Sequence, residues 1–425
     1  MEEKKLVPKL RFPGFTEPWE QRKLDEVFQI IDGDRGKNYP GTGDFLSNGD
    51  VLFLDTGNVR KDGFNFDNKR YIDFNRDKLL RNGRLILGDY VLTSRGTLGN
   101  LAYYSQSIYN RYPHIRINSA MLILRMMNTI KVNNLYLYIT LRSNVINEFM
   151  KHNFVGSAQP HITKKEFSSV LLPIPRQLEE QKIIGDFFDK LEKIITLHQR
   201  KLEHLKLKKK SLLQKLFPKE GEVYPELRFP GFTDPWEQRK FKNFVQIRRG
   251  LTYKPSDIAS SGIRVLRSSN INEDQFITGT NDVFVNIDAV DIPYVKNGDI
   301  LLTSANGSAH LVGKHAIIND IVENSAVHGG FMLLVESKNP QFINALLGSN
   351  WYKKFINLYV SGGNGAIGNL SKSDLEEQDV MFPSEEEQKA IGRVYFYMNH
   401  LITLHQRKLE HLQLLKKALL QQLFV

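Results

Sequence analysis

The chain contains the same unit twice, and this duplication restricts its fold more than any other feature of the sequence. Residues 10–23 (LRFPGFTEPWEQRK) recur at residues 227–240 with thirteen of fourteen positions identical, and residues 196–205 (TLHQRKLEHL) recur unchanged at residues 403–412. Two further blocks repeat with the 207-residue offset of the second pair: EEQK at 179–182 and 386–389, and LLQKLF at 212–217, which returns as LLQQLF at 419–424. Solenoids stack at least three short repeats, so two units of roughly 210 residues indicate a tandem duplication instead.

Between these blocks the two halves have diverged, which divides each half into a variable domain and a constant segment. Faint matches remain between residues 87–94 and 297–304, and between residues 56–59 and 268–271. Residues 218–224 form a polar link between the halves. We therefore expect four parts: variable domains at 8–175 and 219–383, and constant segments at 176–218 and 384–425.

Each constant segment has the heptad spacing of a helix that packs on another helix. In the first segment the predicted seam residues are Ile184, Phe188, Leu191, Ile195, His198, Leu202, Leu205, Lys209, Leu212 and Leu216. In the second they are Ile391, Tyr395, Met398, Ile402, His405, Leu409, Leu412, Lys416, Leu419 and Leu423. Ser384 and Glu387 form a capping-box pattern at the start of the second helix, and Pro218 ends the first. About forty residues at 1.5 Å each give helices of ~60 Å.

Two matched heptad helices in one chain most simply pack on each other, and a duplicated unit can pack them antiparallel about a pseudo-twofold axis. The alternative is a parallel zipper with another chain, which would require the loop after Pro218 to span a full helix length. His198 and His405, like Lys209 and Lys416, either set the register of the seam or lie at its edge with their tips in solvent. The predicted fold class is α+β, with two mixed domains separated by an antiparallel intramolecular coiled coil.

The variable domains mix short β-rich runs, at residues 84–93, 121–126 and 300–303, with helical stretches at 132–150 and 340–359. Their loops are rich in Gly, Asn, Ser and Arg, and polar and cationic loop side chains can read base edges and bind phosphates. The same residue types also serve as solvated surface or loop caps. The candidate DNA-binding residues are Arg60, Lys61, Arg95, Thr97, Arg248, Arg249, Arg267, Ser269, Asn270, Asn306 and Ser308, and the basic run at 206–210 has the same two interpretations.

Charge and composition favour an anionic partner. The formal net charge is +11 over 425 residues, and nucleic acid is the commonest anionic partner of basic proteins. The absence of cysteine excludes disulfides, thiolate nucleophiles and cysteine zinc sites. Neither a signal peptide nor an apolar run of ~20 residues is present, so we expect a cytoplasmic protein without a membrane span.

The sequence lacks the common catalytic motifs. It has no GxxxxGK[ST] phosphate loop, no HExxH metal pair and no Asn/Asp-Pro-Pro-aromatic methyltransferase motif. Residues 363–368 fit GxGxxG, but a helical pattern precedes them and a polar turn follows, so the βαβ context of a dinucleotide site is missing. Glu180-Gln181-Lys182 offers the E-x-K of a nuclease, but no acidic partner is identifiable. The histidines lack ligand spacing, so we expect no metal, no cofactor and no catalysis in this chain.

These features together resemble the specificity subunits of type I restriction-modification enzymes, over essentially the whole chain. The resemblance rests on the entry blocks around Phe12-Pro13-Gly14-Phe15 with Pro18-Trp19 and around Phe229-Pro230-Gly231-Phe232 with Pro235-Trp236. It also rests on the exits, where Leu172-Pro173-Ile174-Pro175 precedes the first EEQK block and Met381-Phe382-Pro383 precedes the second. The combination is specific, whereas each motif alone is not.

The resemblance implies two target-recognition domains, each reading one half of a split, asymmetric site in double-stranded DNA, with paired helices setting the gap. It also implies partners: two modification subunits that methylate adenine with S-adenosylmethionine, and restriction subunits that translocate and cut DNA with ATP and Mg. A ~60 Å strut spans under two turns of B-DNA at roughly 34–36 Å per turn. The modification partner must flip the target adenine out of the stack.

Two other hypotheses fit parts of the sequence. A coiled-coil adaptor whose two heads bind proteins would use the same helices. A nuclease or methyltransferase acting alone would need catalytic motifs that the sequence lacks. A DNA-binding assay distinguishes the adaptor from a recognition subunit. Assays of the isolated protein with divalent metal or S-adenosylmethionine test whether it is an enzyme that acts alone.

Overall fold

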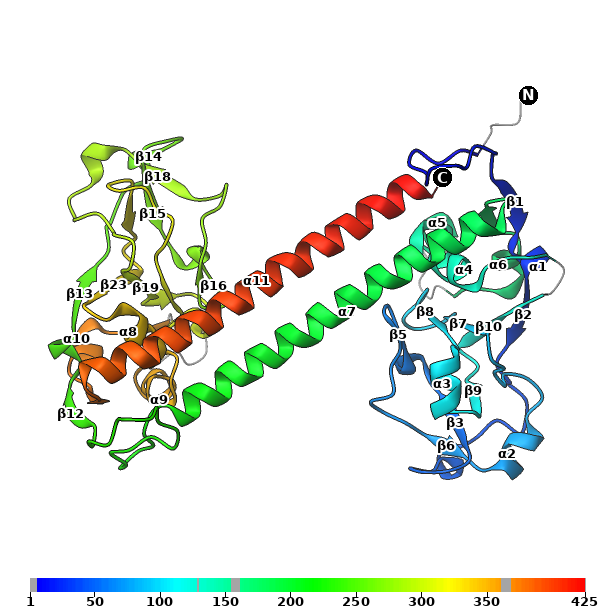
Figure 1. Cartoon of the computed structure of the whole chain (residues 1–425), viewed down its shortest axis with the longest axis horizontal. Coiled ribbons are helices and arrows are strands. Elements are labelled where there is room, and N and C mark those ends of the chain that lie inside the picture. Colours follow the sequence, from blue (N-terminus) through cyan, green and yellow to red (C-terminus); the bar gives the residue numbers. More distant parts are fainter. Residues whose placement is uncertain (1–5, 128–129, 154–160, 361–367, 425) are drawn as a thin grey trace. The chain divides into compact units, whose positions relative to one another are not determined.

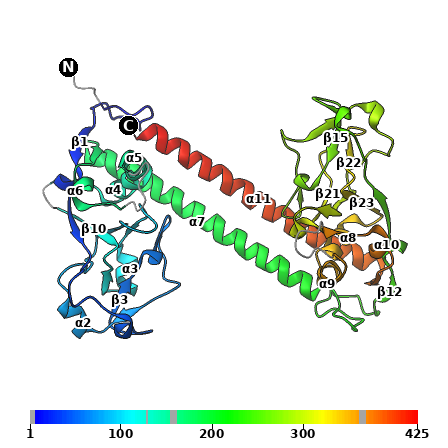
Figure 2. The ribbon, with the colours of Figure 1, turned by 180° about the vertical axis from the view of Figure 1, so that it is seen from behind.

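The computed structural model describes residues 6–127, 130–153, 161–360 and 368–424, which form two compact units. Unit 1 comprises the chain up to Leu197 together with the part from Leu409 onward, and unit 2 comprises His198–Lys408. Two long helices, α7 (Leu178–Lys215) and α11 (Glu385–Leu423), each contribute one part to each unit (Figures 1 and 2). Among the described residues, no helix is both long and apolar enough to cross a membrane.

The head of unit 1 mixes strands and helices. In chain order its elements are β1 (Glu20–Lys23), α1 (Leu24–Val27), β2 (Phe28–Asp32), η1 (Thr42–Asp44), β3 (Val51–Leu54), η2 (Thr56–Asn58), β4 (Val59–Arg60), β5 (Gly63–Phe64), β6 (Tyr71–Ile72), α2 (Phe74–Leu79), β7 (Tyr90–Thr93), β8 (Leu101–Tyr103), α3 (Gln106–Arg111), β9 (Ile115–Ile117), β10 (Met121–Met126), α4 (Asn134–Thr140), the π-helical η3 (Leu141–Val145), α5 (Ile146–Asn153), α6 (Lys164–Ser168) and β11 (Leu171–Ile174).

The head of unit 2 has corresponding elements and a few additional ones. They are β12 (Glu237–Lys240), η4 (Phe241–Asn243), β13 (Val245–Arg249), η5 (Pro255–Asp257), β14 (Ile258–Ala259), β15 (Ile263–Leu266), η6 (Ser268–Asn270), β16 (Ile271–Asn272), β17 (Gln275–Phe276), β18 (Val283–Val285), η7 (Ile287–Ala289), β19 (Ile300–Thr303), β20 (Ala305–Asn306), η8 (Ala309–Leu311), β21 (His315–Ile317), β22 (Ala326–His328), β23 (Met332–Ser337), α8 (Pro340–Leu347), α9 (Asn350–Tyr359), β24 (Gly368–Asn369), α10 (Lys372–Glu376) and β25 (Asp379–Phe382).

The two heads share one topology although their sequences have diverged. The central antiparallel sheet has the order β2-β10-β7-β8 in unit 1 and β13-β23-β19-β21 in unit 2. A second sheet in each unit contains a parallel pair, β3 with β9 and β15 with β22. A third pair joins the entry block to the exit, β1 with β11 and β12 with β25. The duplication predicted from the constant blocks therefore extends through both variable domains.

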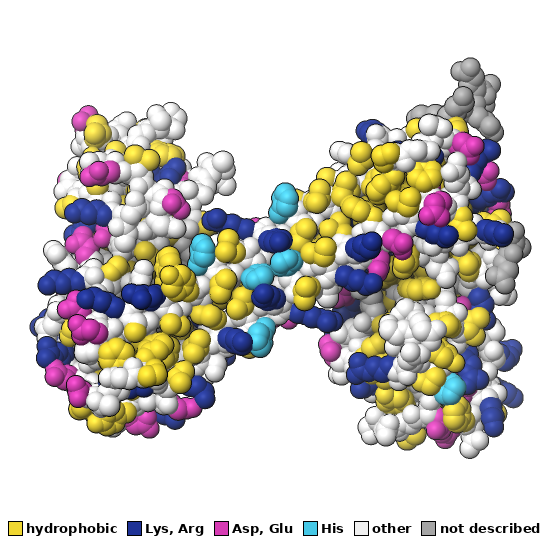
Figure 3. Space-filling view, in the orientation of Figure 1, with side chains coloured by type: hydrophobic (Ala, Val, Ile, Leu, Met, Phe, Trp, Pro, Cys, Tyr) yellow, Lys and Arg dark blue, Asp and Glu magenta, His cyan; other side chains and the backbone are white. Residues whose placement is uncertain are grey.

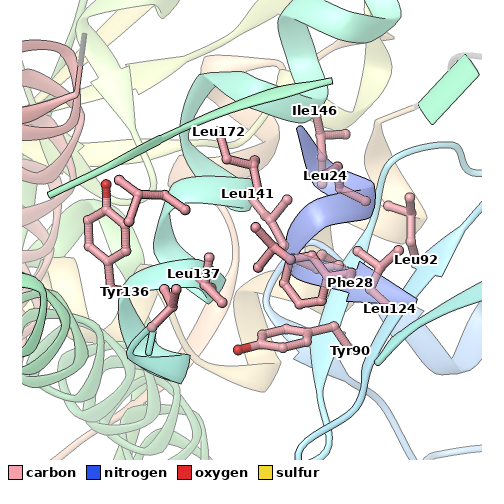
Figure 4. Close-up of a cluster of buried hydrophobic side chains, with 14 of the residues drawn as sticks. Leu24, Phe28, Tyr90, Leu92, Leu124, Tyr136, Leu137, Leu141, Ile146 and Leu172 are labelled. Carbon is pink, nitrogen blue, oxygen red and sulfur yellow. The ribbon is translucent and has the colours of Figure 1, made fainter. Parts of the chain in front are cut away.

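Alternating side chains divide the central sheet of unit 1 between two buried clusters. Tyr90 and Leu92 of β7 face one cluster, which also contains α4 and the start of α7, whereas Val91 faces the other, toward β3 and β9. Figure 4 shows the first cluster, where Phe28, Tyr90 and Leu124 lie against Leu137 and Leu141. The period-2 pattern of a strand buried on both faces explains why these runs read as almost continuously apolar.

The sequence placed several head elements correctly and two of them inexactly. Strands predicted at 121–126 and 300–303 match β10 and β19. The strand predicted at 84–93 was wrong in its first part, because Gly88 has φ +94° and the Asp89 carboxylate accepts a hydrogen bond from the Ile86 amide, which makes a turn before β7. The helix predicted at 340–359 is broken between α8 and α9, at residues 348 and 349.

Within each unit, α7 and α11 pack antiparallel. In unit 1 the first part of α7 shares a buried cluster with the end of α11, through Ile184, Phe188 and Leu423. In unit 2 the end of α7 and the start of α11 share another cluster, through Leu216 and Ile391. The antiparallel intramolecular coiled coil is therefore confirmed within each unit, and all of the predicted seam residues are buried or half-buried.

Candidate nucleic-acid interface

A buried ion pair attaches each head to its helix, and it joins two of the duplicated sequence blocks. Arg11 donates to both carboxylate oxygens of Glu180, at 2.7 and 2.8 Å, and the Trp19 indole also donates to this carboxylate. In unit 2, Arg228 donates to both oxygens of Glu387, each at 2.8 Å. Because a buried carboxylate needs such partners, the blocks LRFPGF and EEQK depend on each other.

The glutamine of each EEQK block satisfies backbone groups at the same junction. Gln181 accepts a hydrogen bond from the Asn133 amide and donates to the Pro175 carbonyl, whereas Gln388 donates to the Pro383 carbonyl. The E-x-K pattern at 180–182 is therefore structural, since its first two residues are buried and fully engaged. The capping box predicted at Ser384 is only half formed: Ser384 accepts from the Glu387 amide, but the Glu387 carboxylate binds Arg228.

In unit 1 the structure brings four candidate DNA-binding residues onto two neighbouring loops. Arg60 and Lys61 lie at the turn of the β4–β5 hairpin, and Arg95 and Thr97 lie in the turn between β7 and β8. The side-chain Nδ2 of Asn100 donates to the Val59 carbonyl at 3.0 Å and so links the two loops. All four candidate side chains are exposed. Arg60 lies 3.6 Å from the exposed Asp67 carboxylate, a distance that leaves it available to a phosphate.

In unit 2 two candidate loops meet through a hydrogen bond. Asn306 donates to the Ser268 hydroxyl at 3.0 Å, which joins the loop of Asn306 and Ser308 to the loop of Arg267 and Ser269. The Ser308 hydroxyl lies 2.9 Å from Nδ1 of the exposed His310. Arg267 is half-buried and donates to the Asn281 carbonyl.

Asn270 is 1% exposed and holds the loop together from inside. Its side chain accepts from the Arg267 amide and donates to the Ile277 carbonyl and the Asp282 carboxylate. Asn58 occupies the equivalent position in unit 1, accepting from the Asp55 amide and donating to two backbone carbonyls. The faint match between residues 56–59 and 268–271 therefore marks a shared loop scaffold. This match in the sequence could have identified Asn58, which is not among the predicted site residues.

The two arginines of β13 have different environments. Arg248 pairs with the Glu336 carboxylate at 2.5 Å and donates to the Pro293 carbonyl, so it ties β13 to β23 and to the loop before β19. Arg249 is exposed, and no ion pair to it is found among the described residues. Of the pair, Arg249 has the guanidinium that is free to meet a phosphate.

Cationic residues continue along the helices. Figure 3 shows Lys, Arg and His side chains interspersed with apolar ones along the helical segment and over both heads. Within the run at 206–210, Lys206 and Lys209 pair with Glu273 and Asp274, whereas Lys208 and Lys210 are exposed. His198 and His405 meet at the seam, with their Nδ1 atoms 3.0 Å apart, so these histidines do pack on each other.

The described residues hold no group of three or more His, Cys, Asp or Glu side chains arranged to bind a metal ion. The GxGxxG pattern at 363–368 lies outside the described residues except for Gly368, which pairs in β24 with Asn306.

Two buried histidines are expected to make unit 2 sensitive to acid. Burial lowers the pKa of His328 to about 4, and burial likewise lowers the pKa of His315. Between the ordinary pKa of histidine and these depressed values the unfolded chain binds protons that the folded unit does not, so stability falls as the pH falls. For His328 the window runs from about pH 6.5 to 4, and the loss is roughly 3 kcal/mol.

We expect the variant His328→Gln to flatten this pH dependence, because its amide keeps a donor for the Arg248 carbonyl and does not titrate. Urea unfolding between pH 7 and 4.5, followed by tryptophan fluorescence, measures the effect through Trp236 and Trp351 of unit 2. An unchanged slope of stability against pH in the variant would assign the acid sensitivity to other groups.

Comparisons with known proteins follow the same division into two repeats. A family model described as "Type I restriction modification DNA specificity domain" matches residues 16–207 and 233–414. The type I restriction enzyme MjaVIII specificity subunit of Methanocaldococcus jannaschii is 26% identical over 315 residues, which are 72% of this chain and 72% of that protein. The putative MjaX specificity subunit of the same organism is 23% identical over 419 residues, 95% of this chain and 92% of that protein.

Solved structures agree in fold. The S subunit of a type I restriction-modification system from M. genitalium aligns with a TM-score of 0.65 at 14% identity, covering 99% of both chains. A chain from a structure concerned with complex assembly and conformational transition of the type I R-M system aligns with a TM-score of 0.52 at 15% identity, covering 98% of both chains.

Proposed function

This chain belongs to the type I restriction-modification DNA specificity family, and on that premise we propose that it recognises a bipartite, asymmetric DNA site and directs partner enzymes to it. The observation that carries the proposal is the pair of heads with one topology and different loops. Two heads of one fold bind DNA in the same manner, whereas different loop side chains read different bases.

The exposed loop residues support direct recognition of DNA. In unit 1 the exposed Arg60, Lys61 and Arg95 lie on two linked loops. In unit 2 the exposed Arg249 lies at the end of β13, and the half-buried Arg267 lies on the loop that Asn306 joins through Ser268. Arginine and lysine contact phosphates and the acceptors of guanine, and asparagine and serine contact other base edges. Contacts with phosphates release counterions from the DNA. We therefore expect the affinity of the protein for DNA to fall steeply as the salt concentration rises.

Repeated apolar residues on the helices support a partner that binds in two copies. Ile194 and Leu197 of α7 match Leu401 and Leu404 of α11, and the four side chains are 43–64% exposed. Leu207 and Leu414 form a third matched pair, 66% and 67% exposed. Each unit therefore presents the same set, and two modification subunits that methylate adenine are the proposed occupants. Restriction subunits that use ATP and Mg complete the proposed complex.

In this proposal the chain itself performs no chemistry and carries no cofactor, since S-adenosylmethionine and ATP belong to the partner subunits. The proposal includes action in the cytoplasm, where the partners and their DNA meet.

The test is a map of methylated adenines across the genome in cells with and without this chain. We expect a split motif with an undefined spacer that disappears when the chain is removed. A purified complex with modification subunits that binds all DNA sequences equally would contradict the proposal, and DNA-independent binding of other proteins by the heads would favour the adaptor hypothesis.

A further inference from the structure

One lysine of the duplicated helix segment meets a carboxylate in both units. Lys209 of α7 and Lys416 of α11 occupy the same place in the repeat, 207 residues apart. The Lys209 amine lies 2.9 Å from the Asp274 carboxylate in unit 2, and the Lys416 amine pairs with the Glu192 carboxylate in unit 1. The two lysines have different carboxylate partners. In each unit, however, the contact connects the helix to the corresponding hairpin of the head.

In unit 2 the connection to the hairpin is direct. Glu273 and Asp274 form the turn between β16 and β17, and β16 directly follows the 3-10 turn that contains Ser269 and Asn270. Their carboxylates pair with Lys206 and Lys209 at 2.5 and 2.9 Å. The turn therefore rests on α7 through two ion pairs.

The turn has a backbone conformation that needs such support. Glu273 and Asp274 have φ values of +45° and +63°, in the left-handed region that side chains disfavour. Two adjacent residues without glycine hold this conformation only when surrounding contacts offset its cost. The pairing of β16 with β17 and the two ion pairs with α7 are contacts that hold the turn in this conformation.

The Lys209 amine is enclosed in the seam. Its side chain is 13% exposed, and its Nζ lies 4.8 Å from the centre of the Tyr395 ring of α11. Burial alone would lower the pKa of Lys209, but Tyr395 and Asp274 raise it above the ordinary value, and the pKa of Asp274 is lowered by Lys209 against the effect of burial. Both groups are therefore charged at neutral pH, and the pair connects α7, α11 and the hairpin.

In unit 1 the connection passes through two more residues. The Glu192 carboxylate accepts from Lys416 and lies 3.6 Å from the Arg142 guanidinium. Arg142 in turn donates to the carbonyl of Lys61, at the turn of the β4–β5 hairpin. This hairpin corresponds to β16–β17 in the shared topology, and it carries the candidate residue Arg60.

We propose that Lys209 and Lys416 are positioning residues that lock the recognition hairpin of each head to the helix pair, and so set the angle at which that head meets its half-site. This inference rests on the proposed function. A hairpin fixed to the helices presents its loop in one orientation, so the complex tolerates one spacing of the two half-sites. A released hairpin pivots and accepts a half-site displaced along the groove.

The test uses the complete chain assembled with its modification subunits, and DNA duplexes that contain the mapped site with its spacer unchanged or altered by one base pair. One base pair rotates a half-site by about 35° and moves it by ~3.4 Å. We expect the original complex to bind the altered spacers at least a hundredfold more weakly. In Lys209→Met, which keeps the length of the side chain without its charge, we expect this discrimination to fall about tenfold, with a smaller change in affinity for the correct site.

The matched variants separate positioning from folding. Lys416→Met tests the hairpin of unit 1, and Lys209→Arg is expected to restore discrimination. Lys208→Met removes an exposed charge from the same helix. Loss of a phosphate contact there would weaken binding to every duplex alike, so the discrimination between spacers is expected to stay unchanged. If Lys209→Met fails to fold, Asp274→Asn breaks the same pair from the hairpin side.

A Lys209→Met or Asp274→Asn complex that rejects altered spacers as strictly as Lys208→Met would overturn the inference and leave the proposed function intact. An original complex that prefers no bipartite sequence would instead refute the proposed function.

Discussion

Replacing residues 24–175 by the variable domain of another family member is expected to change one half of the recognised DNA sequence and leave the other half unchanged. Each mismatched base pair costs about 1–3 kcal/mol, so a new half-site of three base pairs should be preferred over the old one by roughly a hundredfold or more. The change is confined to one half because unit 1 and unit 2 each contain their own loops, sheets and buried clusters.

The junction explains why such an exchange should fold. Arg11, Trp19 and Glu180 stay in the chain, outside the exchanged segment. The incoming domain must supply the start of α4, because the Asn133 amide donates to Gln181, and an ideal Cβ built on Gly185 would lie 3.0 Å from the Asn133 side chain. A family member with the same EEQK block and the glycine three residues after it meets this requirement.

Mapping methylated adenines before and after the exchange measures the result. The control is the matching exchange of residues 241–383, which should change the other half of the motif. A change in both halves after a single exchange would mean that the heads do not read DNA independently.

Removal of the buried carboxylate in Glu387→Ala is expected to destabilise unit 2 by roughly 3–5 kcal/mol, because Arg228 would keep its charge in a largely buried position without its partner. The Glu387 side chain is 1% exposed and that of Arg228 is 15% exposed. Replacing both members by apolar residues, as in Arg228→Met with Glu387→Met, should recover most of the loss, since no unpaired charge remains.

Chemical unfolding followed by tryptophan fluorescence reports on unit 2 through Trp236, which packs beside this junction, and Trp351, and on unit 1 through Trp19. Glu385→Ala is the control, because this glutamate lies at the same helix start but is exposed, and a change within about 0.5 kcal/mol is expected there. Glu180→Ala should have at least as large an effect in unit 1, where Trp19 also loses its acceptor. Equal effects of Glu387→Ala and Glu385→Ala would contradict the role of the buried pair.

Much of the organisation followed from the sequence because it depends on periodicity and on repetition. Heptads record which side of a helix is buried, so residues such as Ile184 and Ile391 identified the seam, and the shared 207-residue offset identified matched helices. Strands that contain an apolar run, such as residues 121–124 at the start of β10, were also visible. Two strand and helix boundaries were misplaced where a single glycine or a side-chain hydrogen bond ended the element, as at Gly88 and Asp89.

The loop residues show the limit of the same reasoning. Asn270 and Asn306 are equally polar in the sequence, but one is a buried internal cap and the other joins two loops at the surface. Arg248 and Arg249 are neighbours, but only the first is tied to Glu336. The composition of these loops predicted that they bind DNA. It could not distinguish the buried or ion-paired residue of each pair from the residue that is available at the surface.

By itself, the sequence determined the duplication, the two long helices, their heptad seam and the basic character of the chain, because each of these is a periodic or summed property of residues along one line. Only the tertiary structure decided that Arg11 meets Glu180, that Asn58 and Asn270 are the same cap, and that Lys209 and Lys416 lead to the two hairpins. Those pairings join residues that are far apart in the chain. Whether two such side chains meet depends on how the whole unit packs, and a local sequence pattern contains no information about that packing.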